Sequence, residues 1–231
     1  MAAHPVFDLG PDRDLDLDAL PLRERKKIQT GIRIWRTAIG LFAARDFDQV
    51  SVAEIAAAAE VSKMTVFNYF PTKEDLVMSP MEQHLDEPAR VVRERAPGTS
   101  AVTALREQFI AALQQLDPAS GLSDDPVVLD VVRLIHRTPA LATRATAGFG
   151  RVAQEHLAAE LLVQDPTHDE LTAQVAAAQL LGARLTLTSD NQRRMLAGER
   201  AADALPGALD RARRAFDLVE RGLGDYCAAP A

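Results

Sequence analysis

Apolar residues recur at a helical period along most of the chain. The first such stripe predicts a helix over residues 22–45, whose apolar positions step by four, three, four and three: Ile28, Ile32, Trp35, Ile39 and Phe42. A second stripe follows at Val52, Ile55, Ala56 and Ala59. We expect the face of the first helix to cover the helices that come directly after it.

Capping signals divide residues 51–76 into short helices. Ser51 with Glu54 three residues later is a capping-box pair, which predicts a helix starting at Val52. Ser62 is suited to cap a second helix over residues 63–69, and Pro71 stops that helix. Two helices joined by so short a turn must cross steeply, as the two helices of a helix-turn-helix do.

The rest of the chain is predicted to be helical too. Thr72 with Asp75 repeats the capping pattern, so a connecting helix should run from Lys73 to about residue 95, interrupted near Ser79-Pro80 and at Pro88. The later helices are expected at residues 99 or 100–116, 127–137, 138–164, 167–187 (opened by a Thr167/Glu170 capping box) and 203 or 205–223. No strand and no internal repeat is predicted, so the fold class is all-α.

The charge is unevenly placed along the chain. The net charge of −7 argues against a nucleic-acid binder, but residues 1–21 hold five Asp against one Arg and form a tail expected to be disordered. Residues 22–45 hold seven basic residues against Glu24 alone. Such a basic leading end is unfavourable for the dipole of its own helix, which indicates an external anion; the alternative is a solvated run of charge.

The helix over residues 63–69 carries the candidate chemistry. Val66 and Phe70 are available to pack on Ile55, which leaves the other positions exposed. In a DNA major groove Lys63 can donate to guanine, Thr65 or Met64 can touch a thymine methyl group, and Asn68 can pair with adenine. The alternative is a small solvated helix with one lysine.

The run from Ser51 to Leu76 resembles the DNA-binding motif of the TetR family of bacterial repressors. The matching residues are Ser51-Val52, Ile55-Ala56, Ala59, Val61-Ser62, Thr65-Val66-Phe67, Tyr69-Phe70, Lys73-Glu74 and Leu76, and upstream Ala38 and Leu41-Phe42. The resemblance covers about residues 27–77. It implies an N-terminal three-helix head with a helix-turn-helix that binds double-stranded operator DNA. The implied contacts are Ser51, Ser62, Lys63, Met64, Thr65, Phe67, Asn68, Tyr69 and Lys73. Of these, Tyr69 and Lys73 match family positions that touch the DNA backbone.

The sequence departs from the family pattern at two positions. Asp46 and Glu60 stand where the family often has glycine, so both are expected to adopt a left-handed backbone. Asp tolerates that conformation, whereas Glu60 should cost about 1 kcal/mol relative to glycine.

The resemblance also implies a larger helical domain for ligand binding and dimerisation, at residues 73–225 behind a head at residues 22–72. By position in the chain, the last two helices should form the homodimer through broad small and apolar faces; the alternative is that these faces close the core of one subunit. They contain Val175, Ala178, Leu181, Gly182 and Leu185, and Ala208, Ala212, Ala215, Phe216 and Val219.

Polar residues on otherwise apolar helices mark a candidate site for a small-molecule effector. Arg133 and His136 lie three residues apart on one helix face, with Phe109 and Phe149 as expected apolar walls. The spacing of the five His residues fits no metal motif, and no nucleophile elbow or phosphate loop occurs, so neither metal nor cofactor is expected and an enzyme has no positive support.

The sequence thus predicts a homodimeric transcriptional regulator, a repressor released from a palindromic operator by a small, mostly apolar molecule. The single Cys, the lack of a long apolar run and the acidic N-terminus favour a cytoplasmic protein without a membrane span. The rival from another class is a small-molecule binding or adapter protein that has lost specific DNA binding. A weaker rival is an enzyme built on the C-terminal helices.

Overall fold

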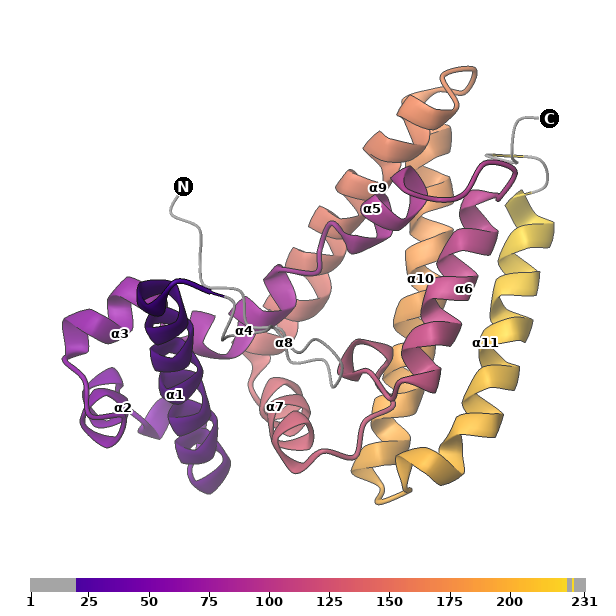
Figure 1. Ribbon diagram of the computed structural model, residues 1–231. Coiled ribbons are helices and arrows are strands. Elements are labelled where there is room, and N and C mark those ends of the chain that lie inside the picture. Colours follow the sequence, from indigo (N-terminus) through magenta and orange to yellow (C-terminus); the bar gives the residue numbers. More distant parts are fainter. Residues whose placement is uncertain (1–19, 224–225, 227–231) are drawn as a thin grey trace. The chain divides into compact units, whose positions relative to one another are not determined.

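The computed structural model describes residues 20–223 and residue 226, and every regular element in these residues is a helix (Figure 1). The expected all-α fold is confirmed. The acidic tail expected at residues 1–21 lies almost wholly outside the described residues. Two compact units are present: unit 1 contains residues 20–83 and 125–145, and unit 2 contains residues 84–124 and 146–223 together with Tyr226. Unit 1 therefore extends beyond residue 72, because later segments pack on the first helix.

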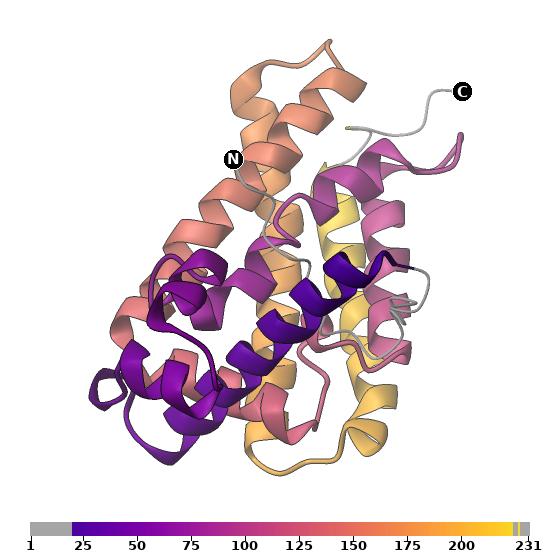
Figure 2. The same ribbon diagram turned by 60° about the vertical axis from the view of Figure 1, so that its left-hand side comes forward.

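Unit 1 is built on the helix α1 (Figures 1 and 2). Its elements are α1 (Leu22–Ala44), the 3-10 turn η1 (Phe47–Gln49), α2 (Val52–Ala58), α3 (Lys63–Tyr69), α4 (Asp75–Glu82), α7 (Pro126–Arg137) and α8 (Pro139–Thr143). Helix α1 contacts α2, α4 and α7. Its predicted apolar stripe is buried at Trp35, Ile39 and Phe42 but only half-buried at Ile28 and Ile32, and Ile34 is buried as well.

The short helices α2 and α3 have the predicted bounds and caps. Ser51 Oγ accepts from the Glu54 amide at 3.2 Å while the Glu54 carboxylate accepts from the Ser51 amide at 2.9 Å. Ser62 Oγ accepts from the Thr65 amide at 3.0 Å. Glu60 has the expected positive φ of 55°. The expectation for Asp46 was wrong: its φ of −64° is extended, because the chain enters η1 there instead of turning sharply.

The connecting helix differs from the prediction. Thr72 and Asp75 exchange the expected capping bonds of 2.8 and 3.2 Å, but α4 begins at Asp75. No break occurs at Pro80, which is buried inside α4, and Pro88 lies in the first turn of α5 (Glu87–Arg93), where a missing N–H costs little. The helix breaks instead at residues 83–86, where the chain passes from unit 1 to unit 2.

Unit 2 is a helical bundle. Its elements are α5, α6 (Ala101–Gln114), the 3-10 turn η2 (Pro118–Ser120), α9 (Gly150–Gln164), α10 (Glu170–Leu196) and α11 (Ala201–Leu223); a π-helical turn (Arg144–Phe149) begins in unit 1 and leads into α9. Helix α10 contacts α6, α9 and α11, and α11 also contacts α6. Figures 1 and 2 show α6, α10 and α11 side by side.

Two predicted features of α10 were wrong. Asp169, not Thr167, caps its start by accepting from the Thr172 amide at 2.8 Å, because Thr167 is bonded to Asp165 instead. The helix also continues past Leu187 to Leu196. Within these added turns Asn191 faces η2, where its Nδ2 donates to the Ser120 carbonyl at 2.9 Å.

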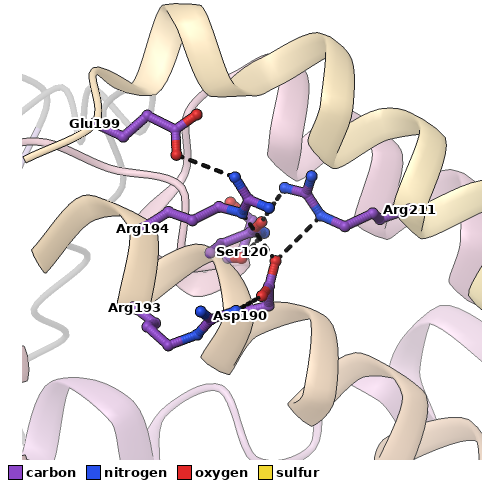
Figure 3. Close-up of polar contacts among 7 residues, drawn as sticks. Ser120, Asp190, Arg193, Arg194, Glu199 and Arg211 are labelled. Carbon is purple, nitrogen blue, oxygen red and sulfur yellow. Dashed lines mark hydrogen bonds and ion pairs between the residues drawn. The ribbon is translucent and has the colours of Figure 1, made fainter. Parts of the chain in front are cut away.

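Asp190 fixes the end of α10 to α11 (Figure 3). Its carboxylate accepts from Arg193, from Arg194 Nε at 3.1 Å and pairs with Arg211 Nε at 3.2 Å, and Arg194 also bonds Glu199 at 3.2 Å. Burial raises the pKa of Asp190, but the hydrogen bonds from Arg194 and Arg193 outweigh that effect and leave it lowered. Three guanidinium groups therefore converge on one carboxylate at this corner of unit 2.

The turn η2 is also held against α10. Gly121 has a φ of 77°, and a Cβ at this position would lie 2.3 Å from the Thr188 carbonyl oxygen. Any side chain there would clash with backbone as well as strain the turn. A few residues later, Asp124 accepts from the Ala201 amide at 3.0 Å and so supplies one acceptor at the start of α11.

Candidate nucleic-acid interface

Helix α3 has one side buried in the core of unit 1 and the other side exposed. Val66 and Phe70 are buried with Ile55 in the core of unit 1. On the other side Met64 is 68% exposed and Phe67 37% exposed, although both side chains are large and apolar. These two side chains give α3 an apolar surface that is open to a partner. Lys63 and Asn68 are exposed beside them, so α3 offers donors, an acceptor and apolar contacts together.

The predicted contact residues are oriented by their neighbours. Thr65 is half-exposed, and its hydroxyl lies 2.8 Å from the Ser62 hydroxyl, which already caps α3. The Lys63 ammonium lies 5.7 Å from the centre of the Phe67 ring. Tyr69 is half-buried, with its ring 6.4 Å from that of Phe70. Helix α3 therefore carries six of the nine predicted DNA contacts, with Ser62 at its cap.

Lys73 is positioned by the core of unit 1. Its ammonium lies 4.2 Å from the centre of the Phe47 ring and 5.8 Å from that of Phe42, within the range of a cation–π interaction. The side chain is half-exposed, so its charge is directed by the two rings but still meets solvent. Lys73 follows α3 by four residues and extends the positive surface beyond the helix.

The cap of α2 is strongly ionised. The Ser51 amide and hydroxyl, and after them Arg45, lower the pKa of Glu54 from 4.5 to about 2. Arg45 Nη1 lies 2.9 Å from Glu54 Oε1, so its charge is already paired. The exposed basic residues of α1 are the candidates for an external anion: Arg23, Lys26, Lys27, Arg33 and Arg36.

Two arginines that the sequence did not single out for the head tie α7 and the π-helical turn to it. Arg137 donates to the carbonyl of Phe42 and, at 3.2 Å, to that of Arg45, and thus satisfies the end of α1. Arg144 donates to Asp75 Oδ1 at 2.7 Å and to Glu82. Burial raises the pKa of Asp75, but hydrogen bonds from Thr72 and Arg144 leave it lowered.

The predicted ligand residues fall in both units. In unit 1, Arg133 and His136 are exposed on α7, and Arg133 Nη1 bonds Asp130 Oδ1 at 3.0 Å. In unit 2, Phe149 is half-buried, and Phe109 is buried with its ring 6.1 Å from that of Phe216. Their role in ligand binding stays a prediction.

Sequence reasoning missed Arg184, whose guanidinium lies 5.9 Å from the centre of the Phe109 ring. The signal was present, because Arg184 stands between Leu180 and Leu187 at the spacing of the buried face of α10. A lone charge at a core position marks a residue with a special partner or ligand.

Other site types find no support in the described part of the chain. There, no three His, Cys, Asp or Glu side chains are grouped so as to hold a metal ion. None of the described helices is long and apolar enough to cross a membrane.

Comparison with known proteins points the same way. Residues 34–79 match the family described as bacterial regulatory proteins, tetR family. The chain is 32% identical over 122 residues to the HTH-type transcriptional regulator TcmR of Streptomyces glaucescens, a match covering 52% of this chain and 54% of TcmR. The chain thus spans about half the length of that relative.

Solved structures share the fold. GusR of Salmonella enterica superposes with a TM-score of 0.54 at 21% identity, covering 84% of this chain and 95% of GusR. NalD of Pseudomonas aeruginosa, described as the secondary repressor of the MexAB-OprM multidrug efflux pump, gives 0.52 at 16% identity, covering 81% and 96%. With the capped helix pair, the match over residues 34–79 shows that this chain carries the N-terminal head of the tetR family of bacterial regulatory proteins, on a fold that these solved structures share.

Proposed function

We propose that this chain is a cytoplasmic, ligand-responsive repressor that binds a palindromic operator as a homodimer. The observation that carries the proposal is the surface of α3, where Lys63, Met64, Phe67 and Asn68 are exposed on a helix capped by Ser62 and anchored by Val66. This combination of donors and apolar groups suits the edges of bases in a major groove. We place DNA binding in residues 22–72 and ligand binding and dimerisation in residues 73–225.

The proposed contacts divide into those that position α3 on the DNA backbone and those that read the bases. Ser51, Ser62, Tyr69 and Lys73 are proposed to meet the DNA backbone, where amides, hydroxyls and a cation fix the register of α3. Lys63, Met64, Thr65, Phe67 and Asn68 are proposed to face the base edges. Selection of bound duplexes from a random DNA pool tests the proposal: an enriched inverted repeat supports it, and no enrichment favours an adapter that has lost DNA binding.

We assign dimerisation to α10 and α11 on the basis of uncovered apolar residues. Along α10 an exposed stripe steps by four, three, four and three: Leu171, Val175, Ala178, Gly182 and Leu185. On α11 the predicted face needs correction, because Ala208, Ala212 and Phe216 are buried within their own subunit, whereas Leu218 is 65% exposed. Sedimentation of wild type and Leu185→Glu tests the assignment, since a charge in this stripe should shift the protein to monomer.

A symmetric dimer must hold its two copies of α3 about 34 Å apart to read two half-sites on one face of a duplex. A small, mostly apolar effector that binds a different arrangement needs a differential affinity of about 1 to 3 kcal/mol to weaken operator binding five- to 150-fold. Linkage requires the operator to weaken effector binding by the same factor. A ligand that stabilises the protein but leaves operator affinity unchanged would contradict this switch.

A further inference from the structure

Three helices of unit 2 bring a small polar cluster into the bundle. Arg184 comes from α10, Glu87 from α5 and Gln108 from α6. Arg184 Nη2 lies 3.5 Å from Glu87 Oε2, and Gln108 Nε2 donates to Glu87 Oε1 at 3.2 Å. The two side chains therefore hold opposite oxygens of one carboxylate, with Phe109 beside the guanidinium.

Each partner of Glu87 keeps one polar atom unsatisfied. Arg184 Nη1 and Gln108 Oε1 are closed off from solvent, and neither has a hydrogen-bond partner. Buried polar atoms in folded proteins are nearly always paired. An unpaired donor and an unpaired acceptor on two side chains that bind the same carboxylate therefore need an explanation. Burial lowers the pKa of Arg184, and the carboxylates of Glu87 and Asp117 offset this effect only in part.

The chemistry of the two atoms defines what would complete them. Arg184 Nη1 needs an acceptor and Gln108 Oε1 needs a donor. Because both side chains meet the same carboxylate of Glu87, one ligand group that carries an acceptor beside a donor matches the pair. Glu87 already balances the charge of Arg184. A ligand carboxylate would add a negative charge near Glu87 and Asp117, and a ligand amine would add a positive charge near Arg184.

We propose that Arg184 Nη1 and Gln108 Oε1 are the polar contacts of the effector site, and that the effector is a neutral, mostly apolar molecule carrying a carbonyl oxygen beside an N–H or O–H group. The proposal rests on the proposed function in taking the chain to be ligand-responsive. Such a molecule supplies one hydrogen bond to each of the two atoms, without displacing the bonds that Glu87 already accepts. Its apolar body would lie against Phe109 and the neighbouring helices.

Three probes with one body and different polar ends test this chemistry. They are 2-naphthamide, which is neutral and carries a carbonyl beside an N–H; 2-naphthoate, its anionic counterpart; and 2-isopropenylnaphthalene, an apolar counterpart of similar shape. Titration of the full-length protein without DNA, followed by the fluorescence anisotropy of each probe, is expected to show the amide binding at least about tenfold more tightly than either counterpart.

Substitutions then assign the preference to the two atoms. Arg184→Met and Gln108→Leu should each weaken 2-naphthamide about tenfold and leave the apolar probe within about twofold, as expected for loss of one buried hydrogen bond. Arg193 is an exposed arginine on the same helix as Arg184, so Arg193→Met should leave the affinity for each probe unchanged. Arg184→Met also removes the ion pair with Glu87, and Gln108→Leu removes a hydrogen bond to it, so each variant should melt at a lower temperature than wild type. A thermal melt followed by circular dichroism checks that each variant is folded at the temperature of the titration.

Several results would overturn the proposal. They are tighter binding of 2-naphthoate than of the amide, equal binding of all three probes, binding of none at millimolar concentration, or an amide preference that survives both substitutions. The wild-type comparison decides the ligand class even if a variant fails to fold. Because these titrations contain no DNA, their failure leaves operator binding standing, and a protein that selects no duplex refutes the proposed function without touching the probe result.

Discussion

Operator binding should depend steeply on salt, because each subunit brings several basic side chains to the duplex. Each subunit offers three basic positions: Arg25 or Lys26 at the leading end of α1, Lys63 on α3, and Lys73 beyond it. Lys73 is the best defined of the three, because Phe47 and Phe42 hold its ammonium at 4.2 and 5.8 Å from their ring centres. A dimer would place about six such charges on the duplex.

The magnitude follows from counterion release. About six cationic groups placed at phosphates or bases give a slope of roughly −5 for log K against log salt, so affinity should fall about a thousandfold between about 50 and 200 mM salt. Lys73→Ala removes one charge from each subunit and should make the slope shallower by about 2. Arg193→Ala, an exposed arginine of unit 2, is the matched control and should leave the slope unchanged.

Filter binding or fluorescence anisotropy with a selected operator, at five or more salt concentrations, measures these slopes. A wild-type slope near zero would show that cations do not dominate the interface. A normal slope in Lys73→Ala would show that the charge held over Phe47 stays away from the phosphates, and it would remove Lys73 from the contact set.

Three further results are expected. Ser51→Ala should destabilise unit 1 by about 1 kcal/mol in urea titrations followed through Trp35, the single Trp, which is buried. The pKa of Glu54 in the folded protein is depressed to about 2, so the stability that Glu54 contributes is full above pH 4.5 and is lost as pH falls toward 2. Lys63→Ala should change base preference in duplex selection, whereas Lys73→Ala should weaken all duplexes alike. Asp190→Asn should lower the free energy of unfolding by about 1 to 2 kcal/mol in denaturant titrations, a partial effect because its arginine partners are partly exposed.

Local signals made α2 and α3 predictable. Both caps act over three residues, so Ser51 with Glu54 and Ser62 with Thr65 are visible in the sequence as they stand in the structure. The left-handed turn at Glu60 was predicted from the family's glycine at that position, although the same reasoning was wrong for Asp46. Residues whose partner is close in the chain leave a readable pattern, and most of the candidate DNA-binding surface is made of them.

Long-range partners left no such pattern. Arg137 is 95 residues from Phe42, and Arg144 is 69 residues from Asp75. The sequence around each arginine therefore does not indicate its partner. The apolar face of α11 was visible, but a sequence does not show what covers a face, and Phe216 proved to pack on Phe109 inside its own subunit. Arg184 was hidden in the same way, because its partner Glu87 lies on another helix.

Arg137 and Arg144 bind later segments of unit 1 to the helices that support α3. Arg137 joins α7 to the end of α1, and Arg144 joins the π-helical turn to the Asp75 side chain. Asp75 in turn caps the turn at Thr72, three residues after the end of α3. The π-helical turn continues into α9, and π-helical segments are frequent at functional sites. One arginine, one capping carboxylate and the short link at residues 70–75 therefore tie the start of the π-helical turn to the end of α3 within unit 1.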